Sequence, residues 1–299
     1  MNPIYLSIMG GLGNQLYILA YADFLQRKLG KRPRLLNFDR NTCALTPAQD
    51  RSRRDLSQDL FTYLGVPFVT TGSWEFRLIR TLRNYIRLYR EPDGEAGLYL
   101  EQALPPRARR PRLVLPGLCR VSGYFQSYHY LSTAFIDRIR RFLERVPLSP
   151  ELQTLAEGID RSDVAIHLRR GDFLKHPEIY RIFGSKHYLT GLDQLASEAP
   201  IGQVYVFSDD FEGIRETLTE IGQRYPLVLV QGGNIYEDLF LLTRFRRYVL
   251  AGSTFSWWGA FCSQYGEEAQ VVVPRQPLRR AHEADSYFPP HWMKIEAEE

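Results

Sequence analysis

The chain has 299 residues, of which 44% are hydrophobic and 24% charged, with a formal net charge of +4 at pH 7. These values exclude a disordered, collagen-like or strongly polycationic chain, and they predict a sizeable core in two domains or one large domain. Its three cysteines lie far apart without a Cys-x-x-Cys pair, which argues against a disulfide framework or a zinc site. No run reaches about 18 apolar residues, and the first residues lack the basic segment of a signal peptide. We therefore expect a cytoplasmic protein, with contact at a membrane surface left open.

The first predicted strand, residues 4–9, leads directly into a glycine-rich loop. Apolar residues at helical spacing follow this loop as far as Leu29, and Gly30 is predicted to end the helix. The loop itself reads Gly10-Gly11-Leu12-Gly13-Asn14-Gln15. Its glycines let the backbone approach a ligand closely, and the start of a helix offers free N–H groups to an anion. G-x-G-x-x-G is absent, however, and a plain tight turn explains the loop equally well.

A longer helix is predicted over residues 74–89, after a strand at 35–38 and a short helix at 58–64. Apolar residues recur along it at helical spacing. Arginine recurs every three or four positions on its other side: Arg77, Arg80, Arg83, Arg87 and Arg90. Such a stripe can contact anionic lipid or steer an anionic acceptor; the alternative is a solvated helix face.

A break in composition near residue 148 predicts a domain boundary. Residues 121–126 are predicted as a strand, and a helix follows as far as Leu143. Pro147 and Pro150 then interrupt the chain. We therefore predict two domains, residues 1–148 and residues 149–299. The tail after position 274 is expected to wrap the surface, with packing back on the first domain left open.

The second predicted domain alternates regularly between strands and helices. The predicted strands are residues 164–168, 204–207, 227–230, 248–251 and 271–273. The predicted helices are residues 186–197, 211–221, 235–243 and 255–264. This alternation predicts a parallel sheet with helices on both faces. In open sheets of this kind, ligands bind beyond the carboxyl ends of the strands.

The strand at residues 164–168 ends in a cluster of charged side chains. The sequence there reads His167-Leu168-Arg169-Arg170-Gly171-Asp172. Because side chains alternate along a strand, His167 and Arg169 are predicted on one side and Arg170 on the other. Guanidinium groups suit a phosphate or diphosphate, because arginine offers a planar fork of donors and stays charged. The alternative is a salt-bridge cluster without a ligand.

Acidic residues follow two other predicted strands. Asp209 comes just after residues 204–207 and can accept a hydrogen bond from a ribose or sugar hydroxyl. The spacing from Asp209 to Glu212 also fits a capping box for the next helix. Asp238 can accept two hydrogen bonds from a guanine edge, or it can be a surface residue in the first turn of its helix.

A hydroxyl-rich helix start completes the predicted rim of the sheet. The sequence there reads Gly252-Ser253-Thr254-Phe255-Ser256-Trp257-Trp258-Gly259. Three hydroxyls and the free N–H groups of a helix start can bind a phosphate together. The alternative is N-capping by one hydroxyl, with both tryptophans in the core.

Together, these segments describe a site for a nucleotide diphosphate. There is no Walker G-x-x-x-x-G-K-[ST], which disfavours a P-loop enzyme. There is no Asp-x-Asp pair, which argues against a metal-bridged nucleotide-sugar site. We therefore predict neither a metal nor another cofactor, because two arginines and a helix dipole can neutralise a departing diphosphate instead.

Five segments in order resemble the α-1,2-fucosyltransferases of glycosyltransferase family eleven. They are Gly10-Gly11-Leu12-Gly13-Asn14-Gln15-Leu16, Gly123-Tyr124-Phe125-Gln126-Ser127, His167-Leu168-Arg169-Arg170-Gly171-Asp172, Val206-Phe207-Ser208-Asp209-Asp210 and Ser253-Thr254-Phe255-Ser256-Trp257-Trp258-Gly259-Ala260. The resemblance implies a GT-B fold, in which two Rossmann-like domains face across a cleft. It also implies metal-independent, inverting transfer of L-fucose from GDP-fucose to O2 of a terminal β-galactoside.

The resemblance also implies roles for individual residues. Arg169 would hold the β-phosphate, and His167 and Asp238 would contact the nucleoside. Thr254 to Ser256 would contact the diphosphate, and Asn14 would reach toward the reaction centre. The remaining predicted donor-binding residues are Gly13, Arg170, Asp209 and Ser253.

The general base and the acceptor stay open at this point. Asp172 is the first candidate for the base and Glu178 the second; Asp172 can instead orient Arg169 or Arg170. The acceptor can be a free oligosaccharide, a lipid-linked oligosaccharide or an O-antigen repeat.

Two other classes of protein compete with this prediction. A nucleotide-sugar epimerase or dehydrogenase would need a full glycine fingerprint and a Tyr-x-x-x-Lys pair, and the chain has neither. A basic module for nucleic acid or acidic lipid would use the arginines between positions 77 and 112 and bind with steep salt dependence. We expect no nucleic-acid partner.

Overall fold

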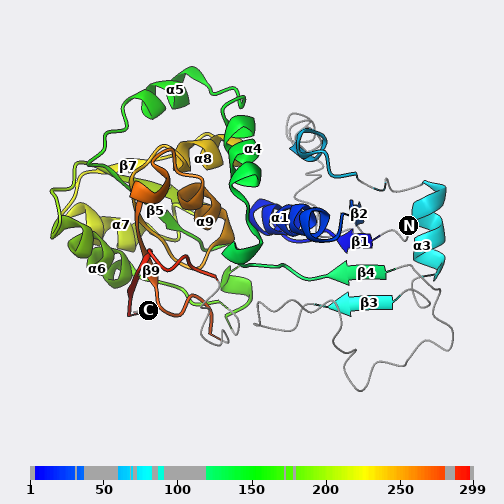
Figure 1. Cartoon of the computed structure of the whole chain (residues 1–299). Helices are drawn as coiled ribbons and strands as arrows, with labels where there is room; N and C mark the ends of the chain where they lie inside the picture. Colours follow the sequence, from blue (N-terminus) through cyan, green and yellow to red (C-terminus); the bar gives the residue numbers. More distant parts are fainter. Residues whose placement is uncertain are drawn as a thin grey trace. The chain divides into compact units, whose positions relative to one another are not determined.

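The computed structural model describes residues 4–30, 32–36, 60–67, 69, 73–82, 87–90, 119–171, 173–177, 180–279 and 287–296. The chain separates into two compact units, Met1–Phe142 and Leu143–Glu299. Each unit has its own parallel sheet with its own helices (Figure 1). The predicted α/β class with parallel sheets is therefore confirmed.

The N-terminal unit is built on a four-stranded sheet in the order β2-β1-β4-β3, with every neighbouring pair parallel. Its strands are β1 (Ile4–Ser7), β2 (Arg34–Leu36), β3 (Arg87–Arg90) and β4 (Cys119–Ser122). Its helices include α1 (Leu12–Leu29), α3 (Trp74–Leu82), the 3-10 turn η1 (Tyr128–Tyr130) and α4 (Thr133–Leu143). A helical turn also covers residues 60–64, as predicted.

Helix α1 forms directly after the glycine loop and is buried over most of its length. Gly30 ends it in the left-handed region, with φ 63°, and donates its N–H to the carbonyl of Gln26. The carboxylate of Asp23 accepts a hydrogen bond of 2.6 Å from Arg138 of α4. The predicted helix and its glycine stop are confirmed, and the ion pair fastens α1 to α4.

The predicted helix over residues 74–89 is wrong in its second half. Helix α3 ends at Leu82, and Arg87–Arg90 forms strand β3, which pairs with β4. The sheet supplies the backbone hydrogen bonds that a longer helix would have made, and this tertiary pairing overrides the helical spacing. The arginines from Arg77 to Arg90 therefore do not form one stripe along one helix.

The C-terminal unit is built on a six-stranded sheet in the order β10-β9-β8-β5-β6-β7, again parallel throughout. Its strands are β5 (Val164–Leu168), β6 (Val204–Ser208), β7 (Leu227–Leu229), β8 (Arg247–Val249), β9 (Gln270–Pro274) and β10 (Met293–Ile295). Its helices and 3-10 turns include α5 (Pro150–Glu157), η2 (Phe173–Lys175), α6 (Ser185–Ala196), α7 (Arg215–Gly222), α8 (Ile235–Leu242), α9 (Thr254–Phe261) and η3 (Gly266–Glu268).

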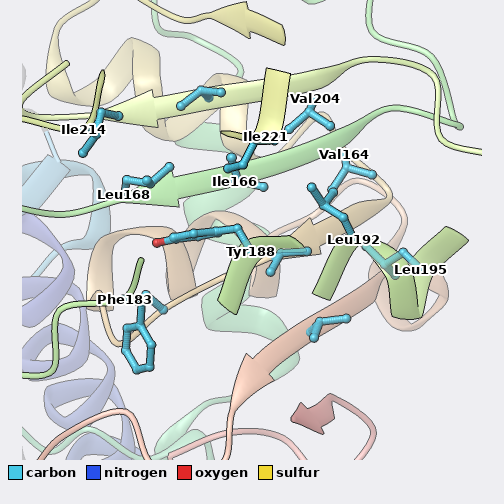
Figure 2. Close-up of a cluster of buried hydrophobic side chains, with 14 residues drawn as sticks. Val164, Ile166, Leu168, Phe183, Tyr188, Leu192, Leu195, Val204, Ile214 and Ile221 are labelled. Carbon is cyan, nitrogen blue, oxygen red and sulfur yellow. The ribbon is translucent and has the colours of Figure 1, made fainter. Parts of the chain in front are cut away.

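The core of this unit packs α6 and α7 onto the central strands. Figure 2 shows Val164, Ile166 and Leu168 along β5, with Tyr188 and Leu192 of α6 beside them. All five side chains are essentially inaccessible to solvent. Burying side chains of this size contributes roughly 1.5–3 kcal/mol each, so β5 is anchored where its charged end begins.

The chain's last described residues close the C-terminal unit. Strand β10 pairs with β9, and the indole N–H of Trp257 donates to the carbonyl of Tyr287 at 2.9 Å. The ring centroids of Trp257 and Trp292 lie 5.6 Å apart. Residues 287–296 are therefore packed on α9 and the sheet edge.

Candidate functional site

The C-terminal sheet reverses its strand order at β5. From β5 the chain passes to β6 and β7 on one side, and then to β8, β9 and β10 on the other. The carboxyl end of a sheet at such a reversal is where open α/β proteins bind ligands. The segments after β5 and β8 meet there, because the ring of His167 lies 5.7 Å from the ring of Phe255 in α9.

Arg169 is held at this point by the carboxylate of Asp209, which follows β6. One Asp209 oxygen lies 3.3 Å from Nη1 of Arg169, and the other accepts the backbone N–H of Arg170 at 2.9 Å. The Arg169 side chain remains 34% exposed. The carboxylate thus fixes a guanidinium group that still reaches solvent and can meet an anionic ligand.

Arg170 has a different environment from its neighbour. Its side chain is buried, and its guanidinium group donates to the carbonyl of Phe183 at 3.1 Å. This hydrogen bond ties the end of β5 to the segment that leads into α6. The side chain of Arg170 therefore lies in the protein interior, whereas that of Arg169 reaches solvent.

His167 is a buried, neutral group at the same strand end. Burial is the main cause that lowers the pKa of its imidazole to about 3, and the nearby charge of Arg169 adds to this effect. Within the described residues its Nδ1 is buried and has no hydrogen-bond partner. Because an unsatisfied buried polar atom costs about 1–3 kcal/mol, His167 is suited to bind a ligand atom.

The start of α9 offers backbone N–H groups. Ser253 occupies the N-cap position but makes no side-chain capping bond, so the capping alternative is wrong for this hydroxyl. The hydroxyl of Ser256 is buried and donates to the carbonyl of Ser253 at 3.3 Å. Thr254, Phe255 and Ser256 form the first turn, whose N–H groups have no partner within the helix. No acidic residue lies in this turn, so the positive end of the helix dipole is not neutralised locally.

The loop before α9 is held firmly. A Cβ atom on Gly252 would lie only 2.7 Å from the carbonyl oxygen of Pro277, so the two segments are in close contact. The hydroxyl of Tyr287 donates to the carbonyl of Gly252 at 3.4 Å. Trp257 and Trp258 lie in the core behind the loop, as one alternative predicted.

Asp209 and Asp238, the acidic residues at the carboxyl edge of the sheet, have different surroundings. Helix α7 begins at Arg215 with Ile214 as N-cap and no side-chain cap, so the predicted capping box from Asp209 to Glu212 is wrong. Asp238 lies in the first turn of α8, where a Cβ on Gly233 would be 2.5 Å from its carboxylate. Helices α8 and α9 both begin at the carboxyl edge of the sheet and pack together, which brings Asp238 to the same rim.

The two candidates for the general base, Asp172 and Glu178, lie outside the described residues. Among the described residues nearby, the rings of Phe173 and Tyr180 are stacked, with centroids 3.9 Å apart. Tyr180 also forms a β-bridge with Leu278. This bridge places Tyr180 next to the segment that follows β9.

The N-terminal sheet has a reversal of its own, between β1 and β4. Because β1 and β4 are parallel neighbours in this sheet, the loops that follow these two strands begin side by side. Asn14 lies in the first turn of α1, next to the buried Gly13, and its side-chain oxygen accepts a hydrogen bond of 2.8 Å from Gln126. The predictions gave Gln126 no role; its place in the loop after β4, a strand that neighbours β1, was the signal that could have found it.

Two further properties concern the described part of the chain. No three His, Cys, Asp or Glu side chains there gather closely enough to hold a metal ion. None of its helices is both long enough and apolar enough to cross a bilayer.

Two α/β units with parallel sheets, each carrying ligand-type loops at a strand reversal, define a protein of the GT-B class. Residues 121–296 match the model of glycosyl transferase family 11. The chain belongs to this family, which confirms the predicted membership.

Curated relatives agree with this assignment. The O-antigen biosynthesis glycosyltransferase WbnK of Escherichia coli is 25% identical over 291 residues, which cover 91% of this chain and 94% of that protein. An α-1,2-colitosyltransferase of Escherichia coli is 26% identical over 189 residues, covering 61% of this chain and 64% of that protein. Galactoside α-(1,2)-fucosyltransferase 2 of Sus scrofa is 26% identical over 203 residues, covering 62% and 58%. The match thus spans less than two thirds of the last two relatives.

Among solved structures, the α-1,6-fucosyltransferase NodZ from Bradyrhizobium, soaked with GDP-fucose, is similar with a TM-score of 0.46. It is 14% identical, and the match covers 88% of this chain and 92% of that chain.

Proposed function

We propose that this protein transfers L-fucose from GDP-fucose to O2 of a terminal β-galactoside, with inversion and without a metal ion. The observation that carries the proposal is the fixed, partly exposed Arg169 at the strand reversal, with the start of α9 nearby. Membership in glycosyltransferase family 11 supports the reaction class.

Arg169 and α9 act on the leaving group in this proposal. When the bond between fucose and the diphosphate breaks, negative charge grows on the departing β-phosphate. A guanidinium already held by Asp209 can receive this charge without reorganising. The N–H groups of Thr254, Phe255 and Ser256 add donors at the positive end of α9.

The neutral histidine and the carboxylate at α8 bind the nucleoside. His167 keeps its ring uncharged across the physiological pH range, because burial depresses its pKa. Its unpaired Nδ1 can then exchange a hydrogen bond with a hydroxyl of the nucleoside. Asp238 accepts from the guanine edge, whose two adjacent donors match the two oxygens of a carboxylate.

The remaining steps take place at the acceptor. Asp172, or Glu178 in its place, takes the proton from the attacking hydroxyl. Asn14 contributes its amide to the reacting sugars. The bond from C1 of fucose to the diphosphate oxygen breaks and GDP departs, while a new bond forms from C1 to O2 of the acceptor through an oxocarbenium-like transition state.

The activities for which the relatives are named suggest a donor sugar and an acceptor for this protein. One relative is named for a galactoside and for α-1,2 transfer of fucose, and another for O-antigen biosynthesis. We therefore propose an O-antigen repeat with a terminal β-galactose as the acceptor. The name of a third relative favours a second candidate donor sugar, colitose, which is fucose without its 3-hydroxyl group.

We also propose a peripheral membrane contact, made by helix α3 alone and not by the whole predicted helix up to residue 90. Helix α3 exposes Trp74 and Leu78 together with Arg77 and Arg80. This face suits the headgroup region of an anionic bilayer. Sedimentation with anionic vesicles tests it: the double variant Trp74→Ser/Leu78→Ser should bind less, and equal binding would refute the contact.

Metal-free transfer assays test the main proposal. GDP-fucose and GDP-colitose are offered with a β-galactoside panel in the presence of a chelator, and the new linkage is located. Arg169→Ala should lower kcat by about 10²–10³-fold. Arg161→Ala is the matched control, because Arg161 precedes β5 at the opposite end of the strand and is 61% exposed.

Thermal stabilisation gives an independent readout of the nucleotide. We expect GDP to raise the melting temperature more than GMP, ADP or NAD without added metal. Loss of activity in the chelator, or activity of Arg169→Ala within about tenfold of the parent, would refute the leaving-group role.

A further inference from the structure

We infer that Gln126 is a positioning residue, whose side-chain amide orients Asn14 for the transfer reaction. This inference rests on the proposed function, since it assumes that the amide of Asn14 contacts a substrate. The side-chain nitrogen of Gln126 donates to the side-chain oxygen of Asn14 at 2.8 Å. The two residues come from the loops that follow β4 and β1, which are neighbours in the sheet.

Gly10 limits the side chain of Asn14 from the other side. Gly10 has φ +77°, and a Cβ atom there would lie 2.6 Å from the Asn14 side-chain nitrogen and 2.9 Å from its Cβ. The loop therefore presses directly against Asn14. Only glycine combines this backbone conformation with the space that Asn14 occupies.

Gln126 is itself presented by a strained backbone. Phe125, the residue before it, has φ 53°, and among the described residues it is the one non-glycine residue with a positive φ. A bulky residue adopts this conformation only where its surroundings enforce it. The Phe125 ring is buried and stacked on Tyr21, with centroids 3.9 Å apart and planes within 5°.

The strained backbone at Phe125 therefore holds the side-chain amide of Gln126 against that of Asn14. Because Gln126 supplies a donor, the side-chain oxygen of Asn14 is fixed toward Gln126. The Asn14 nitrogen is then turned to the opposite side, and within the described residues it has no hydrogen-bond partner. We infer that this nitrogen donates to an oxygen of a reacting sugar.

The decisive variant is Gln126→Glu, which replaces the donor by an acceptor. An ionised carboxylate would repel the Asn14 oxygen and attract its nitrogen, so the Asn14 amide would rotate. We expect kcat for transfer to fall about 10²-fold at pH 7.5, the typical cost of one misplaced donor. Stabilisation by GDP should stay unchanged, because the residues proposed to bind the diphosphate all lie in the other unit. Gln194→Glu is the matched control, since Gln194 is an exposed residue of α6.

A pH profile separates positioning from a merely structural role. Below the ordinary glutamate pKa of about 4.3, the new carboxyl group is protonated and regains an O–H donor. The ratio of Gln126→Glu activity to parent activity should therefore rise as the pH falls. A structural defect would leave this ratio constant or lower it.

Asn14→Ala distinguishes failure of this inference from failure of the proposed function. Normal activity of Asn14→Ala would refute the proposed role of Asn14. An inactive Asn14→Ala together with a fully active Gln126→Glu would overturn the positioning role alone. If Gln126→Glu does not fold, Gln126→Ala takes its place in a double-mutant cycle with Asn14→Ala. Strong coupling in kcat supports the inference, and additive effects overturn it.

Discussion

Arg169 and Asp209 form an ion pair of 3.3 Å that joins the ends of two neighbouring strands, β5 and β6. The same carboxylate accepts the backbone N–H of the residue after Arg169. One side chain therefore fixes both the guanidinium group and the chain that carries it. This arrangement gives the site a preorganised positive charge.

Asp209→Asn should reduce transfer without unfolding the protein. Asparagine keeps an oxygen for the Arg170 N–H but loses the charge that holds Arg169. We expect kcat to fall about 10- to 100-fold, since a hydrogen bond to a charged group contributes about 1.5–3 kcal/mol. Steady-state kinetics with GDP-fucose measure the change. Asp210→Asn is the control, because among the described residues the Asp210 carboxylate accepts a hydrogen bond from the Gly213 N–H in its own loop and holds no arginine. An equal loss in both variants would contradict the role of Asp209.

His167 should make the parent protein less stable as the pH falls. Its folded pKa, about 3, lies below its ordinary value, so between pH 6.5 and 3 the unfolded chain binds a proton that the folded chain does not. The contribution is complete above about pH 6.5 and is lost progressively below it. Urea unfolding of the parent and His167→Gln at pH 7.5 and 5.0 measures the effect. The difference in unfolding free energy, parent minus variant, should shrink at pH 5.0; a constant difference would show that His167 titrates normally.

Arg247 should be essential for the stability of the C-terminal unit. Its buried guanidinium group donates to the carbonyls of Leu195, in the last turn of α6, and of Ala199 and Pro200, which follow that helix. Burial lowers the pKa of this arginine from its ordinary value. In Arg247→Met the Leu195 carbonyl would keep two backbone N–H donors, but the carbonyls of Ala199 and Pro200 would have no other donor among the described residues. The unfolding free energy should therefore fall by about 3–5 kcal/mol. Calorimetry measures it, and a loss below about 1 kcal/mol would contradict this account.

Trp292 should stabilise the C-terminal unit far more than Trp74 stabilises the N-terminal one. Trp292 is buried against Trp257 and Phe288, whereas Trp74 is 74% exposed. We expect Trp292→Ala to lower the unfolding free energy by about 3–5 kcal/mol. Trp74→Ala is the matched control and should change it by less than about 0.5 kcal/mol. Thermal unfolding followed by circular dichroism compares the two; similar effects would contradict the packing described for residues 287–296.

The regular part of the fold could be read from the sequence because its signals are local. From β5 to β8 each strand is followed by a helix, and the predicted elements match the observed ones within a few residues. The α3 prediction failed because helical spacing continues past Leu82, while pairing with β4 decides the structure of Arg87–Arg90. Strand β10 was missed because it is short and is held by pairing with β9. Helix α5 was missed because Pro147 and Pro150 were interpreted as interruptions, whereas Ser149 caps the helix and Pro150 opens it.

The sequence predicts which residue types line the candidate site better than it predicts which residues contact one another there. The rim position of Arg169 follows from the end of β5, but its carboxylate partner depends on the register between β5 and β6. The spacing around Asp209 suggested a helix cap, and the actual start of α7 at Arg215 depends on local turns that the spacing does not reveal. Burial of Arg170 and neutrality of His167 depend on packing across the sheet, which no local pattern encodes.

Gly171 has an ordinary backbone conformation, yet any Cβ atom there would overlap the carboxylate of Asp209. The position therefore demands small volume rather than unusual flexibility. A larger side chain at 171 would displace the Asp209 carboxylate, and with it the contact that holds Arg169. Directed-evolution libraries aimed at new donor sugars should therefore leave position 171 as glycine, since any side chain there disturbs the anion-binding arginine indirectly.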